Sequence, residues 1–459
     1  MRVPFRGPVG FALLLSAAGD GTAQTRRLDR SEVARIVDSL AVAAKASGEV
    51  PGFSVGVAIG STVRITSGYG QADLENAVPA TAETIYRIAS VTKQFTGAAV
   101  VQLVEQGKLK LDDRLTTYFP NWPAPAEQVT VRMLLNHTSG VRDYVAVPRW
   151  RQLRTVPLPH DSLLGLVINE PFDFPPGTAF RYSNTGYYIL GVIIEKVSGL
   201  RYGDYIEQRL AQPLGLTSIR YCDDRPVIAK RARGYSRTKE GFANAQYIDM
   251  NQPFSAGSLC ASVGDLLDWS RALARGKVVS AEGYRTMTTP VALPEDQPMN
   301  YGFGLSTGVL AEHRFIYHNG SVDGFRSQLI TFPDDSLTIA IIANADAGLP
   351  EALERRISRR LLAIPETVIK DLPIPPALRA RVVGRYRLGE DFVQVAADGA
   401  GLSITLPGAP AARLLYQGDE KFVLDNRREV GVSFRGTGPV ASDLVLATPG
   451  AAVMLTRAP

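Results

Sequence analysis

The stretch Ile-Tyr-Arg-Ile-Ala-Ser-Val-Thr-Lys-Gln-Phe-Thr-Gly, residues 85–97, decides both the fold and the chemistry of this 459-residue chain. From Val91 to residue 104 the sequence is nearly all apolar, and Gly107 follows as a C-terminal cap, so we predict a buried helix. Ser90 and Lys93 then lie on one helix face, with about 5–6 Å between their Cβ atoms. Because burial lowers the pKa of a lysine, Lys93 can take the proton of Ser90 without a histidine. The sequence therefore predicts an acyl-enzyme hydrolase.

The spacing of this pair is weak evidence by itself, because Ser236-Arg-Thr-Lys239 repeats the same Ser-x-x-Lys pattern. The second copy lies in a polar segment with no buried helix after it, and we interpret it as chance. Two further elements follow the first copy in order, and they supply the chemical context that the spacing lacks.

The first of these elements is Tyr182-Ser-Asn184, which follows a Pro-Gly turn and precedes a predicted helix over residues 185–197. A tyrosine there can relay protons, and an asparagine amide can both donate to and accept from a substrate amide. The other element is His318-Asn-Gly320 on a predicted strand, where glycine lets a substrate backbone approach closely. Together the three elements describe a site for acyl transfer.

With these elements the chain resembles the serine β-lactamase and penicillin-binding protein superfamily, over roughly residues 30–365. It is most similar to the class C-like branch of β-lactamases, D-alanyl-D-alanine carboxypeptidases, D-aminopeptidases and esterases. Segments 134–140, 212–216, 255–259 and 318–324 also resemble that family. The resemblance implies these roles: Ser90 as nucleophile, Lys93 as base, Tyr182 as second proton carrier, Asn184 as substrate anchor, His318 and Gly320 as the strand wall, and the backbone N–H groups of Ser90 and Ser321 as the oxyanion hole.

One departure from the family pattern concerns the substrate. Most true class C β-lactamases have lysine where this chain has His318, and a neutral histidine binds a carboxylate less strongly than a permanent cation. We therefore favour a D-amino-acid peptidase, carboxypeptidase or esterase over a β-lactamase. Arg326 on the adjoining strand either supplies the missing charge or is an ordinary strand-edge arginine. The alternatives are a penicillin-binding sensor with slow turnover and a true class C β-lactamase.

Two other patterns compete for the role of nucleophile or base. Gly52-Phe-Ser-Val-Gly56 matches the nucleophile elbow of α/β-hydrolases, but an elbow needs a strand before it and this motif opens one. We therefore interpret Ser54 as a sheet residue. His137, near Asp143 in sequence, could belong to a Ser-His-Asp triad, but we interpret it as a histidine that hydrogen-bonds its own loop.

The predicted fold class is α+β. It comprises an antiparallel sheet flanked by helices, with an inserted and mostly helical subdomain, as in β-lactamases, and a small C-terminal all-β barrel or sandwich. We expect a signal peptide over residues 1–23, a β-lactamase-like hydrolase domain over 24–368, a Pro-rich linker over 369–378 and a β-barrel-like domain over 379–459. The leader predicts a periplasmic or secreted protein with no stable membrane span after its removal.

The composition limits the kinds of partner and cofactor that we expect the protein to bind. The formal charge of +5 comes from 50 basic residues scattered among 45 acidic ones, so we expect no nucleic acid. Four histidines without ligand spacing predict no metal, and the proposed chemistry needs no organic cofactor. Cys222 and Cys260 form a candidate disulfide in an oxidising compartment. We expect a small-molecule or short-peptide substrate, such as a peptidoglycan-derived or D-amino-acid compound.

Overall fold

The computed structural model describes residues 28–293, 299–365, 368–388, 391–426, 430–448 and 451–458. The predicted signal peptide, residues 1–23, lies outside these ranges. Within them no helix combines the length and apolar character needed to cross a lipid bilayer.

A seven-stranded antiparallel sheet forms the centre of the region that precedes the C-terminal barrel, in the order β3-β2-β1-β12-β11-β10-β9. Phe53 in β1 pairs with Ala343 in β12, so segments nearly 300 residues apart share one sheet, as predicted. The strands are β1 (Gly52–Ile59), β2 (Val63–Asp73), β3 (Val78–Pro79), β9 (Ser306–Leu310), β10 (His313–Val322), β11 (Phe325–Phe332) and β12 (Leu337–Ala343).

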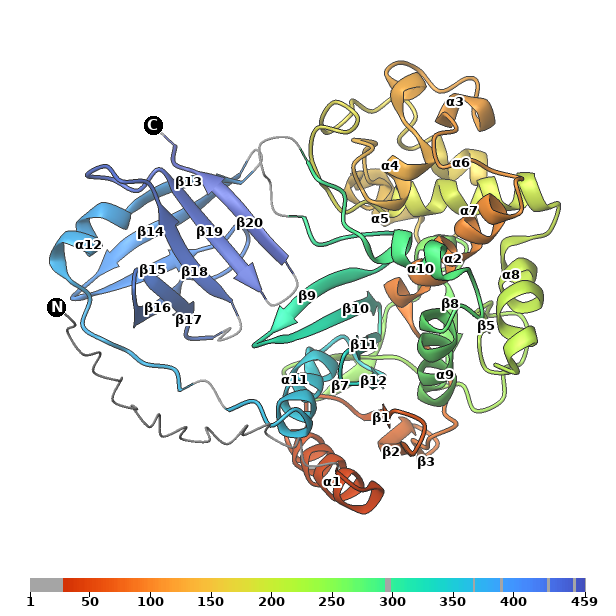
Figure 1. Cartoon of the computed structure of the whole chain (residues 1–459), viewed down its shortest axis with the longest axis horizontal. Helices are drawn as coiled ribbons and strands as arrows, with labels where there is room; N and C mark the ends of the chain where they lie inside the picture. The colour runs from red at the N-terminus through yellow and green to blue at the C-terminus, as the bar shows by residue number, and fades with distance from the viewer. Residues whose placement is uncertain are drawn as a thin grey trace, which may run out of the picture.

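Helices cover both faces of this sheet (Figure 1). Helices α1 (Arg30–Ala46) and α11 (Leu349–Leu361) pack together over one face, and α9 (Val263–Ala274) packs on β1 and β12 from the other. Every residue of β12 is buried, which explains why its sequence is a continuous run of mostly apolar residues rather than an alternating one.

The inserted subdomain is mostly helical, and it lies beside α2 (Thr92–Glu105) (Figure 1). Helix α7 (Asn184–Ser198) is its buried centre, capped by the hydroxyl of Ser183 and ended by Gly199 at φ 72°. Its other elements are α3 (Leu115–Tyr118), α4 (Val131–Leu135), α5 (Pro148–Leu153), α6 (His160–Leu164), α8 (Tyr202–Tyr205), α10 (Ala281–Thr288), β4 (Tyr86–Arg87), β5 (Arg220–Tyr221), β6 (Tyr235–Arg237), β7 (Phe242–Asn244) and β8 (Leu259–Ala261).

The C-terminal region is a nearly closed antiparallel barrel whose strands follow sequence order. A bridge between Tyr386 and Arg457 joins the first strand to the end of the last. Helix α12 (Pro376–Val382), which begins inside the predicted linker, adds Leu378 and Val382 to the barrel core. The strands are β13 (Gly384–Leu388), β14 (Asp391–Asp398), β15 (Gly401–Thr405), β16 (Ala412–Gly418), β17 (Lys421–Leu424), β18 (Gly431–Arg435), β19 (Asp443–Thr448) and β20 (Ala451–Thr456). The predicted fold class is confirmed.

Candidate active site

The nucleophile candidate sits on a tight turn, Ala89–Val91, at the start of α2. Ala89 adopts a left-handed conformation with φ 48°, which costs a non-glycine residue about 1–2 kcal/mol. Neighbouring strands hold the turn in place. The hydroxyl of Ser327 donates to the carbonyl of Ile88 at 2.7 Å, and the N–H of Ile88 donates to the carbonyl of Leu259 at 3.0 Å. Ser90 therefore has a fixed position between the sheet and the helical subdomain.

Lys93 is fully buried one turn further along the helix. Its Nζ lies 3.2 Å from Oγ of Ser90, 2.9 Å from Oδ1 of Asn184 and 2.8 Å from the carbonyl of Ala256. Burial lowers the pKa of Lys93 to about 7, against the opposing pull of the Asp143 carboxylate. The amide and carbonyl oxygens can only accept hydrogen bonds. A neutral Lys93 therefore donates its two N–H groups to these two oxygens, and its lone pair points toward Ser90.

Tyr182 completes the group of proton carriers. Its ring lies 4.7 Å from Nζ of Lys93, measured to the ring centroid, and 4.4 Å from the ring of His137. Burial of its hydroxyl raises the pKa of Tyr182, while a hydrogen bond with Ser90 acts in the opposite direction. Although the residue as a whole is 36% exposed, its hydroxyl lies inside the site and stays protonated at rest. It can therefore hand a proton onward when Lys93 replaces it.

Asn184 links Lys93 to a carboxylate that the sequence analysis did not place in the site. Its Nδ2 donates to Oδ2 of Asp143 at 3.1 Å, while its Oδ1 accepts from Lys93. Asp143 is mostly buried, and that burial raises the pKa of its carboxyl group. The pattern of the sequence pointed to Asp143 only as a partner for His137. In the structure Asp143 provides the counter-charge of Lys93 instead.

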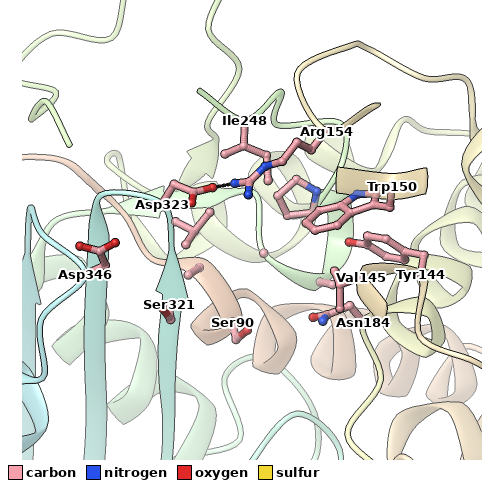
Figure 2. A pocket seen from close by; sticks show the side chains of 15 residues that line it. Ser90, Tyr144, Val145, Trp150, Arg154, Asn184, Ile248, Ser321, Asp323 and Asp346 are labelled. Atoms are coloured by element: carbon pink, nitrogen blue, oxygen red, sulfur yellow. Dashed lines mark ion pairs between the residues drawn. The ribbon is translucent and has the colours of Figure 1, made fainter. Parts of the chain in front are cut away.

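Strand β10 runs directly against the nucleophile turn at Gly320. A Cβ atom on Gly320 would lie 2.3 Å from the carbonyl oxygen of Ile88 and 3.0 Å from the backbone nitrogen of Ser90. Strand β9 pairs with β10 only as far as Tyr317, so residues 318–322 have no β9 partner beside them. Ser321 and Ser90 line the same pocket (Figure 2). The structure thus brings together the two residues whose N–H groups the family resemblance assigns to the oxyanion hole.

His318 is buried, and both of its ring nitrogens are occupied. Nδ1 lies 2.6 Å from the carbonyl oxygen of Asn319, which can only accept, so Nδ1 carries the proton. Nε2 then accepts from the hydroxyl of Tyr301 at 2.8 Å. Burial and the Lys93 charge lower the pKa of His318 to about 3. His318 is therefore a neutral residue in the wall of the site. Tyr301, like Asp143, is a residue of the site that the sequence analysis did not identify.

Two residues weighed in the sequence analysis, Arg326 and Ser54, lie outside the reaction centre, and a third, His137, packs against Tyr182. Arg326 pairs with Glu351 of α11 at 3.3 Å, on the sheet face that α11 covers, so it does not supply the missing cation. Ser54 is a buried sheet residue whose hydroxyl donates to the carbonyl of Thr81 at 2.7 Å. His137 accepts the N–H of Ser183 through Nδ1 at 3.1 Å. The interpretation of Ser54 as a sheet residue agrees with its contact, whereas His137 bonds to Ser183, in the Tyr182-Ser-Asn184 element, and not to its own loop as predicted.

Cys222 and Cys260 are both buried and are free thiols in this structure. They share a small cluster with Ile228, and a hydrogen bond between the two thiols lowers the pKa of Cys222. The candidate disulfide is therefore not formed here, although its two sulfur atoms are neighbours. In the part of the chain that the structure describes, no three His, Cys, Asp or Glu residues converge as metal ligands.

A pocket of about 280 Å³ opens beside Ser90 (Figure 2). Asn184 and Ser321 line its floor, while Trp150 and Tyr144 from the helical subdomain form one side. The remaining lining residues are Ala89, Val145, Arg154, Ile248, Pro253, Ala256, Gly257, Val322, Asp323 and Asp346. The pocket thus exposes a serine that is hydrogen-bonded to a buried lysine.

A serine that lines the pocket, with a buried lysine of lowered pKa and a tyrosine beside it, is the arrangement expected of a serine hydrolase. Residues 37–364 match the family model described as Beta-lactamase, and the chain belongs to this family within the serine β-lactamase and penicillin-binding protein superfamily.

Three similar proteins illustrate the relationship. Penicillin-binding protein 4* of Bacillus subtilis is 27% identical over 384 residues, which cover 78% of this chain and 84% of that protein. The D-aminopeptidase of Gluconobacter oxydans is 25% identical over 360 residues, covering 77% of this chain and 66% of that protein. The solved structure of an octameric penicillin-binding protein homologue from Pyrococcus abyssi has a TM-score of 0.66 at 26% identity, covering 92% of this chain and 99% of that one. That structure matches most of the chain, beyond the catalytic region alone.

Proposed function

We propose that this protein is an exported serine hydrolase that cleaves an amide or ester bond through an acyl-Ser90 intermediate, of the D-amino-acid peptidase or esterase type. The observation that carries the proposal is the contact of 3.2 Å between Nζ of Lys93 and Oγ of Ser90, with Lys93 fully buried and its pKa lowered to about 7. The D-aminopeptidase relative supports the substrate class. Export rests on the leader predicted over residues 1–23.

Acylation follows from the positions of the side chains. Neutral Lys93 takes the hydroxyl proton of Ser90 as Oγ bonds to the substrate carbonyl carbon. The carbonyl oxygen becomes an oxyanion between the N–H groups of Ser90 and Ser321, where each donor contributes roughly 2.7–4 kcal/mol to transition-state stabilisation. Tyr182 gives its proton to the leaving group and regains one from Lys93. The bond to the leaving group then breaks and the acyl-enzyme remains.

Deacylation reverses this proton path with water as the nucleophile. Water loses a proton to the Tyr182 and Lys93 pair while its oxygen bonds to the acyl carbon. The bond from the acyl carbon to Oγ breaks, and Ser90 regains its proton. No group outside the chain and the water molecule is required for this balance.

The test is a panel of D-aminoacyl anilides, D-alanyl peptides, short esters and β-lactams, assayed with the wild type and Ser90→Ala. We expect turnover of D-aminoacyl amides or esters and a one-to-one covalent adduct by intact mass, both lost in Ser90→Ala. A Ser90→Ala protein that still forms the adduct would overturn the assignment of the nucleophile.

A second candidate is a penicillin-binding protein with slow turnover, which the similarity to penicillin-binding protein 4* favours. Burst kinetics separate the two functions. Stoichiometric release of a chromophore that then stops, with every ester and anilide in the panel, supports the binding protein. Continued release after the burst supports the hydrolase.

A further inference from the structure

The mouth of the pocket is bridged by an ion pair between Arg154 and Asp323 (Figure 2). Arg154 directly follows α5 in the helical subdomain, whereas Asp323 lies between β10 and β11 of the sheet. The pair therefore joins the two sides of the pocket over the nucleophile. The two side chains are only 20% and 25% exposed, so water screens their attraction less than that of a surface pair.

Both partners rest on firmly held backbone. The carbonyl of Arg154 accepts the N–H of Asp249 at 3.0 Å, and its guanidinium lies 5.3 Å from the centroid of the Trp150 ring. On the other side, Gly324 adopts φ 78° next to Asp323, and a Cβ atom there would lie 2.7 Å from Cα of Gly234. These contacts hold the backbone on both sides of the bridge, so the two charged side chains are presented to each other across the pocket.

The charge left over in the pocket is negative. Arg154 is the only arginine, lysine or histidine among the described residues that line it, and its charge is matched by Asp323. Asp346 lines the opposite side and is exposed, and among the described residues it accepts a single side-chain hydrogen bond, a long one of 3.4 Å from Ser236. The other cationic candidates add no unmatched positive charge. His318 is neutral, Arg326 pairs with Glu351, and Lys93 has a pKa lowered to about 7 and the Asp143 carboxylate nearby.

We propose that Arg154, Asp323 and Asp346 determine specificity: they select an acyl donor with a free ammonium group and reject one with a carboxylate. Asp323 occupies the one guanidinium that could receive a substrate carboxylate, and Asp346 offers an unmatched negative charge to an ammonium group. This inference rests on the proposed function and makes it narrower. It disfavours carboxypeptidase substrates and penicillins, which carry a carboxylate.

Three substrates that differ in one charge test the proposal: the p-nitroanilides of D-alanine, N-acetyl-D-alanine and N-succinyl-D-alanine. Dissociation constants are measured by calorimetry on the Ser90→Ala protein, where the substrates stay intact. Binding is thus scored without turnover, and a failure of the proposed hydrolysis remains distinguishable. We expect the ammonium compound to bind more tightly than the acetyl compound, and the succinyl compound to bind least tightly.

Variants in the Ser90→Ala background then assign the residues. Asp323→Asn frees Arg154 and improves succinyl binding relative to acetyl binding by roughly tenfold. Arg154→Gln frees Asp323 and shifts the preference further toward ammonium. Asp346→Asn, an exposed change that does not touch the bridge, weakens ammonium binding relative to acetyl binding by roughly threefold or more. Asp112→Asn, at an 83% exposed side chain that does not line the pocket, is the matched control and leaves all ratios unchanged.

Two results would overturn the proposal. One is tightest binding of the succinyl compound to the protein with Arg154, Asp323 and Asp346 intact. The other is an equal change for all three compounds, or no change, in every variant, which would make the bridge purely structural. Absence of measurable binding by all three compounds also counts against it, because the pocket would then not recognise D-aminoacyl groups.

Discussion

The hydroxyl of Tyr301 lies 2.8 Å from Nε2 of His318, and this contact fixes the histidine as a neutral hydrogen-bond acceptor. Because Nδ1 donates to the carbonyl of Asn319, neither nitrogen is free for a substrate. His318 therefore differs from the lysine of class C β-lactamases in its charge, and also because neither of its ring nitrogens is free to bind a substrate. It shapes the strand wall without attracting an anion.

The first prediction concerns this neutral state. With a pKa lowered to about 3, His318 should stay uncharged from pH 5 to 8, and its ring nitrogen shifts in NMR should not titrate there. Tyr301→Phe removes the donor and leaves a buried acceptor unsatisfied, which should lower the free energy of unfolding by about 1–3 kcal/mol. A His318 signal that titrates near pH 6.5 in the wild type would contradict the assigned tautomer and burial.

Lys93 should impose a pH dependence on acylation. The neutral amine is the base, and its fraction grows as pH rises through its pKa of about 7, so kcat/KM should rise with pH and level off above that value. Lys93→Arg stays charged and should lose roughly 10²–10⁴-fold in acylation rate. The exposed Lys110→Arg is the matched control. A rate independent of pH between 5 and 9 would argue against Lys93 as the base.

Gly320 should tolerate no side chain. Alanine there would place Cβ 2.4 Å from Oγ of Ser327 as well as against the nucleophile turn, so Gly320→Ala should reduce acylation at least a hundredfold. Gly348→Ala meets nothing within 4 Å at an ordinary φ of −75° and serves as control. Circular dichroism checks that both variants fold. Near-normal acylation by a folded Gly320→Ala protein would mean that the strand moves freely.

Glu354 should make stability depend on pH. It is fully buried on α11, where burial raises its pKa from 4.5 to about 7. Between those values the folded state keeps a proton that the unfolded state has lost, so stability falls as pH rises. Glu354→Gln should therefore gain about 1–3 kcal/mol at pH 8 and little at pH 4.5, measured by urea unfolding. The exposed Glu240→Gln should show no such difference; an equal gain at both pH values would contradict the ionisation argument.

The neighbouring thiols of Cys222 and Cys260 should oxidise in an exported protein. We expect the secreted protein to resist alkylation after denaturation without reductant, and to take two alkyl groups after reduction. Peptide mapping under non-reducing conditions identifies the pair. Two thiols that are both alkylated without reductant would remove the predicted disulfide.

Local sequence patterns predicted much of the fold because the formation of helices and strands depends largely on residues that are close in the sequence. The buried helix predicted from Val91 to residue 104 is α2, Thr92–Glu105, and the helix predicted over residues 185–197 lies within α7. The small C-terminal all-β barrel or sandwich that the sequence predicts is a nearly closed barrel of eight strands in the described part of the chain. Strand β9 was missed, since Ser306-Thr-Gly-Val-Leu310 lacks a strong pattern and is held by pairing with β10.

The candidate site was predictable where its residues stand in motifs and was not where only folding brings them together. The structure gathers Ser90, Lys93, Tyr182 and Asn184, each of which the motifs marked. Asp143, Tyr301 and Arg154 carry no motif signal, because their roles depend on contacts with residues 17 to 169 positions away in the sequence. The charge state of His318 depended on such a partner, so the sequence could name the residue but not its tautomer.

The final strand, β20, closes the barrel, and it also covers the edges of the two strands beside it, β13 and β19. Strand β20 pairs with β19 and lies against β13, where Arg457 bridges to Tyr386. Proteolytic loss of that one strand would uncover two sheet edges at the same moment, each able to recruit a strand from another molecule. Protecting β20 from proteases during purification should therefore help to keep the protein from aggregating.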